Sequence, residues 1–574
     1  MQKKYDYIII GAGSAGCVLA NRLSKDPNNQ VLLIEAGGPD KNMYIHIPAG
    51  CAKLHKTEVD WGFETEPQEH VLNRKVYLPR GKTLGGCSST NYMAYVRGNK
   101  EDYNDWEAQG NKGWGYNDVL PYFKKSEHNE DIDNEFHNKG GELNVGFSKA
   151  FSTPYSQAFI DACKEVGFDE NKDYNGAVQK GAGLFQNTIK KGKRNSAAVA
   201  FLNPIKDRKN LTILTHTLTE KVLIEDDVAV GVKVQNKKGQ TATYHCNKEV
   251  IVSAGSFNSP QILMLSGIGD QAELAEHGID CVKDLPGVGK NLQDHLMYFL
   301  SGSTKKQDAQ NHHLTIPNQV IDLANYLVFK KGALTQGPLE AVAFGSTSQS
   351  PDRVDYQFHF ASLSTGPKYD ADLYDINTLP TKDGVTILPT LLRPKSRGTV
   401  QLKSNKITDK VLIQPNFLEA EEDKKVLLES GKKAIEILKS NAFTKVLDQL
   451  YIPEGDDALM QHILENVETV FHPVGTCKMG SDDMAVVDDR LRVKGIDQLR
   501  VIDASIMPTI VSGNTNAPTI MIGEKGADMI LMDAQMEGVK EIQKDDLLSE
   551  LNTLQLKDKA PIKILRDGKE ENAG

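Results

Sequence analysis

The first 35 residues constrain the fold most, because an apolar run, a glycine motif and an acid follow one another in a fixed order. Tyr7–Ile10 is almost entirely apolar, as expected of a buried parallel strand. The motif GAGSAG (Gly11–Gly16) follows at once and leads into a helical stretch. A second apolar run, Val31–Ile34, ends at Glu35. This order predicts a Rossmann-like unit that binds a dinucleotide.

The glycine motif has the residue types that a pyrophosphate requires. Gly11 permits a tight turn, Gly13 lets the backbone approach the pyrophosphate, and Gly16 lets helix and strand pack closely. Ser14 and Ala15 lie between them at the start of the predicted helix. The free N–H groups and the positive dipole end of a helix N-terminus favour phosphate. We therefore expect all five residues at the cofactor.

Glu35 and its neighbour Ala36 complete this pattern. A carboxylate about 20 residues after the glycines can bind a ribose hydroxyl. It favours an adenosine ribose without a phosphate, and it does not choose between NAD and FAD. A GxGxxG motif alone often marks only a tight turn. Here strand, glycines, helix, second strand and acid occur together, which favours dinucleotide binding.

Bulk properties exclude several classes of protein. A length of 574 residues predicts roughly two to four domains. The net charge of -10 argues against nucleic acid, because phosphate binding needs a basic face. The seven cysteines form no CxxC pair, so we expect neither a metal site nor a disulfide framework. We identify no signal peptide or membrane span, and we expect a cytoplasmic protein, with peripheral contact to the inner membrane face as an alternative.

Further strands are expected downstream. Leu211–Leu214 and Val250–Val252 are apolar, and residues 221–235 alternate around Asp226-Asp227 as in a hairpin. Leu499–Ser505 reads as a strand that returns to the first sheet, and Pro518–Met532 reads as a closing helix. The chain would therefore begin and end in the same domain.

These patterns predict an α/β protein with a discontinuous nucleotide-binding domain. We expect residues 1–300, some of which contribute to the second domain, and 488–534 to form that domain, and residues 301–487 to form a substrate domain. In the substrate domain, Tyr356–Phe360 alternates as a half-buried strand would. Residues 535–574 form a charged tail, either frayed or docking a subunit or a membrane.

Four separated motifs, taken in order, resemble the glucose–methanol–choline (GMC) oxidoreductase family, which uses FAD. They are Gly11–Gly16 with Glu35, Gly81–Arg97, Gly255–Gly269, and the region from His472 to Thr519. The resemblance covers residues 5 to 532. HPVGTCKMG and GNTNAPTIMIGEKGADMI look most like bacterial choline dehydrogenases and related FAD-dependent alcohol dehydrogenases.

The resemblance implies an FAD-binding domain, a substrate domain on an antiparallel sheet flanked by helices, and an active site between them. It implies further FAD contacts at Thr83, Gly86, Asn91, Met93, Ala94, Val222, Asp503, Ala504, Asn516, Pro518 and Thr519. Some family members attach FAD through a histidine where this chain has Thr90. Since threonine cannot form that bond, we expect noncovalent FAD.

The resemblance implies catalytic roles for His472 and Asn516. A histidine titrates near neutrality and can take the hydroxyl proton of an alcohol, while an amide can donate to the alkoxide oxygen. We expect oxidation of a primary alcohol, with choline as one candidate, and electrons passing to a quinone-type acceptor. An oxidase that uses O2 stays open, as does a non-oxidising relative such as a hydroxynitrile lyase or a fatty-acid photodecarboxylase.

Overall fold

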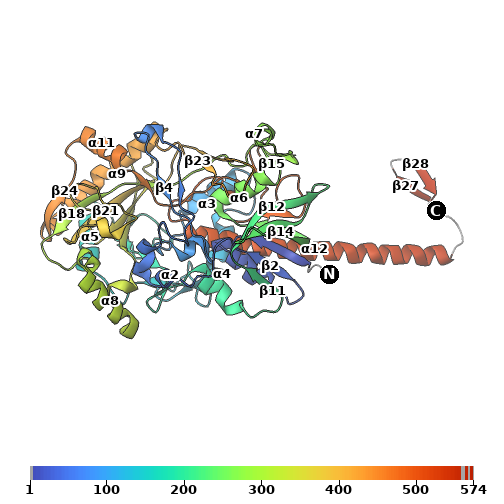
Figure 1. Ribbon diagram of the computed structural model, residues 1–574, viewed down its shortest axis with the longest axis horizontal. Coiled ribbons are helices and arrows are strands. Elements are labelled where there is room, and N and C mark those ends of the chain that lie inside the picture. The colour runs from blue at the N-terminus through green and yellow to red at the C-terminus, as the bar shows by residue number, and fades with distance from the viewer. Residues whose placement is uncertain (1–3, 558–562, 567–568, 573–574) are drawn as a thin grey trace. The chain divides into compact units, whose positions relative to one another are not determined.

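The computed structural model describes residues 4–557, 563–566 and 569–572, with side chains to residue 536 (Figure 1). The chain divides into a large unit that ends at Lys525 and a second unit that begins at Gly526. Both large sheets and the candidate site belong to the large unit. Among the described residues, none of the helices combines the length and apolarity that crossing a bilayer requires.

The first large sheet has a parallel half built from the strands that the apolar runs predict. β1 (Tyr5–Ile10) lies between β2 (Val31–Ile34) and β14 (Thr241–Val252), and β11 (Leu211–Leu214) pairs with β2. β26 (Leu499–Val501) pairs in parallel with the end of β14. The predicted return of the chain to its first sheet is therefore confirmed, although the strand ends earlier than Ser505.

The other half of this sheet is the predicted hairpin. β12 (Thr217–Glu225) and β13 (Val228–Asn236) pair antiparallel around Asp226 and Asp227, which both have positive φ, and β13 continues the sheet to β14. Helix α1 (Ser14–Leu23) covers the start of the chain. A Cβ atom on Gly16 would lie 1.9 Å from Gly11 O, so only glycine allows α1 this close to β1.

The second large sheet has eight strands and is antiparallel throughout, which confirms the expected antiparallel sheet, although two of its strands lie before residue 301. Its strands are β7 (Gly181–Leu184), β17 (Leu296–Met297), β18 (Leu300–Thr304), β19 (Leu339–Gly345), β20 (Tyr356–Ala361), β21 (Gly384–Leu391), β24 (Leu447–Tyr451) and β25 (Glu468–Thr469). Figure 1 shows β18, β21 and β24 on the opposite side of the unit from β2, β12 and β14.

Strand β20 departs from the prediction. Its alternation suggested a half-buried strand, but all six residues are buried. Tyr356, Phe358 and Phe360 belong to an apolar core shared with α5 (Pro154–Glu165) and α9 (Glu421–Leu438). The polar side chains on the other face of β20 are covered as well, because that face turns toward the candidate site.

Smaller elements fill the connections. The remaining helices of the large unit are α2 (Met43–His46), α3 (Lys100–Ala108), α4 (Tyr116–Ser126), α6 (Gly255–Leu265), α7 (Gln271–Glu276), α8 (Ile316–Phe329), α10 (Asn441–Thr444) and α11 (Asp456–Asn466). Short strands are β3 (Phe63–Glu64), β4 (Tyr77–Leu78), β5 (Glu127–Asn129), β6 (Leu143–Phe147), β8 (Gln186–Asn187), β9 (Ile189–Lys190), β10 (Lys193–Arg194), β15 (Ile268–Gly269), β16 (Lys283–Asp284), β22 (Thr399–Gln401) and β23 (Leu412–Gln414).

The predicted closing helix is longer than expected. Helix α12 begins at Asn516, two residues before Pro518, and its backbone stays helical to Lys557. The second unit also holds the hairpin of β27 (Lys563–Arg566) and β28 (Lys569–Asn572). The leucine side chains that suggested a docking surface in the tail, Leu547, Leu551 and Leu554, lie outside the described residues.

Candidate active site

A cavity begins at the carboxyl end of β1, where the glycine motif turns into α1. Gly13 forms part of its wall, and a Cβ atom placed on Gly13 would meet nothing within 4 Å. The backbone there faces open space at a helix N-terminus, the arrangement that suits a pyrophosphate. The residues present therefore fit the phosphate part of FAD.

Glu35, the acid that follows β2, also lines the cavity. Glu35 accepts hydrogen bonds from Ala12 N at 2.9 Å and Gly37 N at 2.8 Å. Burial raises the pKa of Glu35 to about 7, although these two N–H groups act in the opposite direction. Nearby, Thr219 Oγ1 is buried on the wall without a hydrogen-bond partner among the described residues. These polar groups fit the ribose and adenine end of a dinucleotide.

Most residues predicted to contact the cofactor line this one cavity. They are Gly11, Gly13, Ser14, Ala15, Glu35, Ala36, Gly86, Asn91, Met93, Ala94, Asp503, Ala504, Asn516 and Thr519. Gly16, Thr83, Val222 and Pro518 lie behind the wall instead. Thr83 Oγ1 donates to Gly38 O at 3.0 Å, and Val222 N donates to Ser266 Oγ at 2.8 Å. Residues 217–219 of β12 provide the wall near Val222.

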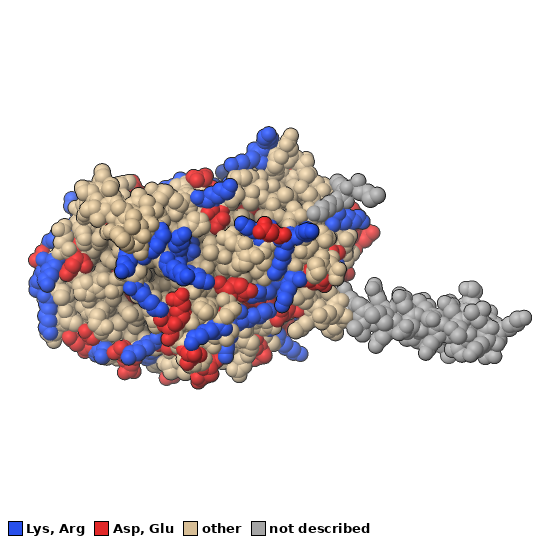
Figure 2. Space-filling model, turned by 90° about the horizontal axis from the view of Figure 1, so that it is seen from below, with Lys and Arg blue, Asp and Glu red and all other residues tan. Residues whose placement is uncertain are grey.

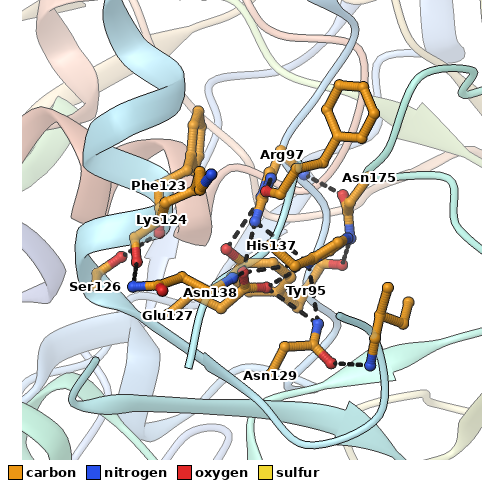
Figure 3. Close-up of polar contacts among 12 residues, drawn as sticks. Tyr95, Arg97, Phe123, Lys124, Ser126, Glu127, Asn129, His137, Asn138 and Asn175 are labelled. Atoms are coloured by element: carbon orange, nitrogen blue, oxygen red, sulfur yellow. Dashed lines mark hydrogen bonds and ion pairs between the residues drawn. The ribbon is translucent and has the colours of Figure 1, made fainter. Parts of the chain in front are cut away.

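A buried ion cluster anchors the second predicted cofactor surface, residues 81–97, from behind (Figure 3). Arg97 Nη2 donates to Glu127 Oε2 at 2.7 Å, and His137 Nδ1 lies 3.0 Å from Glu127 Oε1. Asn175 accepts from Arg97 N at 2.8 Å and donates to Tyr95 O at 3.1 Å. Desolvation raises the pKa of Glu127, but the charges and hydrogen bonds of Arg97 and His137 outweigh it, so the pKa is lowered. This cluster fixes the segment that carries Met93 and Ala94 to the cavity.

His472 lies at the other end of the cavity, among side chains from three distant segments. Its Nδ1 is 3.0 Å from His295 Nδ1, and its Nε2 is 3.2 Å from Asn514 Nδ2. Asp294 accepts from the backbone N–H of both histidines at 2.8 Å. The motif around His472 gave no indication of His295 or Asp294, because they come from a loop 177 and 178 residues earlier.

Burial shifts the pKa values of His472, His295 and Asp294, and these shifts determine which of the three side chains are charged. Desolvation lowers the pKa of His472 well below 6.5, and His295, His359 and Arg80 act in the same direction. Burial likewise lowers the pKa of His295 to about 3. It raises the pKa of Asp294 to about 7, against Arg80 and the two backbone donors. Both histidines are therefore neutral near pH 7.

The hydrogen-bond network then assigns the tautomers. His295 Nε2 lies 3.0 Å from Leu392 O, which can only accept, so Nε2 carries the hydrogen of His295. The Nδ1 of His295 must accept, and the Nδ1 of His472 must donate to it. The Nε2 of His472 is thus unprotonated, and it accepts from Asn514 Nδ2. The cavity wall therefore includes a histidine, His472, whose Nε2 is unprotonated.

The two asparagines of the C-terminal motif have different neighbours. Asn514, rather than Asn516, lies next to His472, and its Oδ1 is 3.5 Å from Gln357 Nε2 on β20. Asn516 begins α12, and its Oδ1 accepts from Ser14 Oγ at 2.7 Å. The prediction placed His472 and Asn516 together at the cofactor, and both line this cavity, but the amide in contact with His472 is that of Asn514. Asn516 joins the wall beside the glycine motif.

A second cavity adjoins the first at Tyr92, Leu339, Val470 and Phe471, which line both. Its wall is mainly apolar and includes Met297, Phe299, Leu323, Leu363, Leu373 and Leu388. The one carboxylate among the described lining residues is that of Asp322, whose Oδ2 lies 2.7 Å from His313 Nδ1. An apolar chamber thus ends next to His472.

Comparison with known proteins agrees with this geometry. Residues 5–297 and 394–523 match the two family models described as GMC oxidoreductase. An alcohol dehydrogenase (acceptor) of Pseudomonas putida is 44% identical over 540 residues, which are 93% of this chain and 96% of that protein. An oxygen-dependent choline dehydrogenase of Sinorhizobium fredii is 40% identical over 92% of this chain and 95% of that protein.

Solved structures share the fold. A formate oxidase variant of Aspergillus oryzae, studied for its FAD modification, superposes with a TM-score of 0.87 at 28% identity, covering 93% of this chain and 99% of that one. Pyridoxine 4-oxidase superposes with a TM-score of 0.81 at 29% identity, covering 92% and 99% of the two chains. Matches of this length, together with the glycine cradle (Gly11–Gly16) and the two adjoining cavities, show that the chain belongs to the GMC oxidoreductase family.

Proposed function

We propose that this protein oxidises an apolar primary alcohol to the aldehyde, with His472 as the base that takes the hydroxyl proton. The observation that carries the proposal is the unprotonated Nε2 of His472, which lines the first cavity directly after Phe471, a residue that lines both cavities. A base must lie within hydrogen-bond reach of the proton that it removes. Because burial keeps His472 neutral, the base is available across the physiological pH range.

FAD would be held by the glycine cradle, Glu35 and the wall from residue 86 to 94, and it supplies the acceptor of the substrate hydride. The N-terminus of α12, at Asn516, lies on the same wall, where its dipole favours negative charge. We propose that Asn516 helps to bind the cofactor through its contact with Ser14. With Thr90 on the wall, where a histidine would be needed for the histidyl bond, the FAD should be noncovalent.

We assign the second catalytic role to Asn514 rather than Asn516. In the free protein, the Asn514 amide donates to His472 Nε2. When the substrate hydroxyl donates to that nitrogen, the amide is free to donate to the substrate oxygen. As the proton moves to His472, this oxygen becomes an alkoxide, and a donor aimed at developing charge stabilises the transition state.

The substrate class follows from the second cavity. A choline cage needs aromatic faces with a carboxylate nearby. Tyr92, Tyr374 and Phe471 bring aromatic rings to the second cavity, but the ammonium of Lys56 already lies 5.4 Å from the Tyr374 ring, and the cavity's Asp322 is engaged by His313. An alkyl chain, by contrast, would meet apolar side chains along the chamber. We therefore favour an aliphatic alcohol over choline.

For the electron acceptor we propose a quinone-type molecule rather than O2. Support comes from the 44% identical relative, whose name specifies an acceptor, although oxidases occur among the similar structures. The geometry of His472 and Asn514 suits either route, because both begin with the same removal of a proton and a hydride.

The test is anaerobic reduction of the FAD-loaded protein by a series of straight-chain alcohols and by choline, followed by air. We expect the flavin colour to bleach with the alcohols, and kcat/KM to rise about fourfold per CH2 group until the chamber is full. We expect slow recolouring in air that a quinone accelerates. Bleaching by choline alone would contradict the substrate class. Cleavage of mandelonitrile without bleaching would instead identify a lyase.

Acid precipitation tests how the flavin is held. Noncovalent FAD should leave a yellow supernatant and a colourless pellet. A yellow pellet would show a covalent bond formed by a residue other than a histidine at position 90.

A further inference from the structure

Helix α8 exposes an apolar face to solvent. Six of its large apolar side chains are 57–78% exposed, namely Ile316, Val320, Ile321, Leu327, Val328 and Phe329. The exposed positions of this helix carry no charged side chain. Scattered apolar residues are common on protein surfaces, but a contiguous helical face of this kind marks an interaction site.

The inner side of α8 is held by polar contacts, which reverses the usual amphipathic pattern. Asp322 and Tyr326 are its buried residues, and Asp322 accepts from or pairs with His313 at 2.7 Å. Gln319 Oε1 accepts from Lys53 Nζ at 3.1 Å. Since polar groups fix the inner side, the apolar face is directed outward by the fold itself.

Lysines surround one end of this face. Lys330 caps α8, and Lys331 follows it. The turn between β9 and β10 lies against the same end, because a Cβ atom on Gly192 would be 3.4 Å from Lys330 O. This turn contributes the exposed side chains of Lys190, Lys191 and Lys193. In the part of the chain that the structure describes, these lysines form no ion pair with a carboxylate.

Figure 2 looks onto the side of the molecule on which α8 lies in Figure 1. An area without charged side chains lies at the upper left of that view, and a group of basic side chains lies below it and to its right. An apolar surface beside positive charge that is not balanced by described carboxylates matches the composition of an anionic membrane interface.

The mouth of the second cavity opens within this face. Ile316 and Val320 line the cavity and are exposed at the same time, and so is Met43 of α2. A protein partner seated on α8 would cover this mouth, whereas the acyl region of a lipid layer would leave it open to apolar solutes. A bilayer is therefore the occupant that fits both features.

We propose that the exposed face of α8, with Lys190, Lys191, Lys193, Lys330 and Lys331, docks on a bilayer that contains anionic lipid. Docking then brings the mouth of the second cavity to the acyl region. If the proposed function holds, an apolar alcohol enters from the lipid without crossing bulk water; the docking itself does not depend on the reaction.

The experiment is flotation of the purified FAD-loaded protein with phosphatidylcholine vesicles, with and without phosphatidylglycerol. The triple variant Ile321→Gln, Val328→Gln, Phe329→Gln removes apolar surface that does not line the second cavity. We expect its partition coefficient to fall by about 100-fold or more. The variant Val178→Gln, Val282→Gln, which alters exposed apolar residues elsewhere, should bind as the wild type does.

Further measurements separate the contribution of the lysines to docking from that of the apolar face, and separate docking from the reaction. Replacing Lys190, Lys191 and Lys193 with glutamine should abolish most of the gain from phosphatidylglycerol and weaken the dependence of binding on salt. Flavin reduction by a short, water-soluble alcohol should be equal in the wild type and the α8 variant without vesicles. If neither protein reacts with the alcohol, that result contradicts the proposed function and leaves the docking proposal unaffected. Failure of the wild type to float with anionic vesicles would overturn the docking proposal. So would a wild-type dimer that the α8 variant converts to a monomer, because a second copy would then occupy the face.

Discussion

Replacement of His295 by leucine tests whether one histidine sets the tautomer of the other. In the wild type, a series of hydrogen bonds runs from Leu392 O through the rings of His295 and His472 to Asn514, with lengths of 3.0, 3.0 and 3.2 Å. Leucine removes the acceptor for His472 Nδ1–H. The ring of His472 can then carry its hydrogen on Nε2, where it is unable to take a proton from the substrate.

The expected loss follows from the burial of this contact. A buried donor that loses its acceptor costs about 1–3 kcal/mol, and this free energy is what favours the reactive tautomer. The rate of flavin reduction should therefore fall about 5- to 150-fold in His295→Leu. Glutamine at position 295 keeps an amide oxygen toward His472 and an NH2 group toward Leu392 O. We expect His295→Gln to retain the rate within about fivefold.

The assay is anaerobic stopped-flow mixing with an alcohol, which follows the loss of oxidised flavin absorbance over a range of concentrations. The limiting rate should fall while the apparent dissociation constant of the alcohol stays unchanged. His462→Leu serves as the control, since it removes the contact from His462 Nε2 to Phe299 O at 2.8 Å, and the His462 side chain lines neither cavity. Equal limiting rates for the leucine and glutamine variants, at equal FAD content, would refute the tautomer argument.

Three other predictions concern the surrounding groups. Asn514→Ala should slow flavin reduction by about 100-fold at unchanged FAD content, whereas Asn516→Ala should lower the flavin-to-protein ratio after gel filtration, because only Asn516 bonds Ser14. Because the pKa of Asp294 is raised to about 7, the folded state keeps a proton that the unfolded state loses above pH 3.8, so its contribution to the unfolding free energy declines as pH rises across this window. Urea unfolding at several pH values should show a smaller decline in Asp294→Asn, and an equal decline would contradict the raised pKa. His137→Leu takes one partner from Glu127, which keeps Arg97, and one from Asp173, and it should lower the unfolding free energy by about 1–3 kcal/mol, as urea titration would show.

The nucleotide-binding half was largely predictable from sequence, because its signals are local. The run from Tyr7 to Glu35 encodes strand, turn, helix and strand within a short window, and the structure has all four in place. The parallel return of residues 499–501 was also predictable, since a short apolar run followed by polar residues suits the edge position that β26 takes.

The partners of His472 were not predictable in the same way. Asn514 and Asn516 are two residues apart in one motif, and the turn before α12 decides which amide reaches the histidine. His295 comes from a loop far away in the sequence, and a lone histidine there has no distinguishing pattern. Helix periodicity likewise marks the apolar stripe of α8 but cannot say whether it faces a core or the solvent.

The pairing of β26 with β14 has a consequence for biosynthesis. The parallel sheet lacks this strand until the ribosome has made residues 499–501. At about 5–20 residues per second, the roughly 250 residues between the two strands take roughly 12–50 seconds to translate. During this interval the nascent chain carries an open sheet edge next to an unfinished nucleotide cradle. Capture of FAD should therefore follow synthesis of β26, and the supply of free flavin at that moment would determine how much of the protein matures.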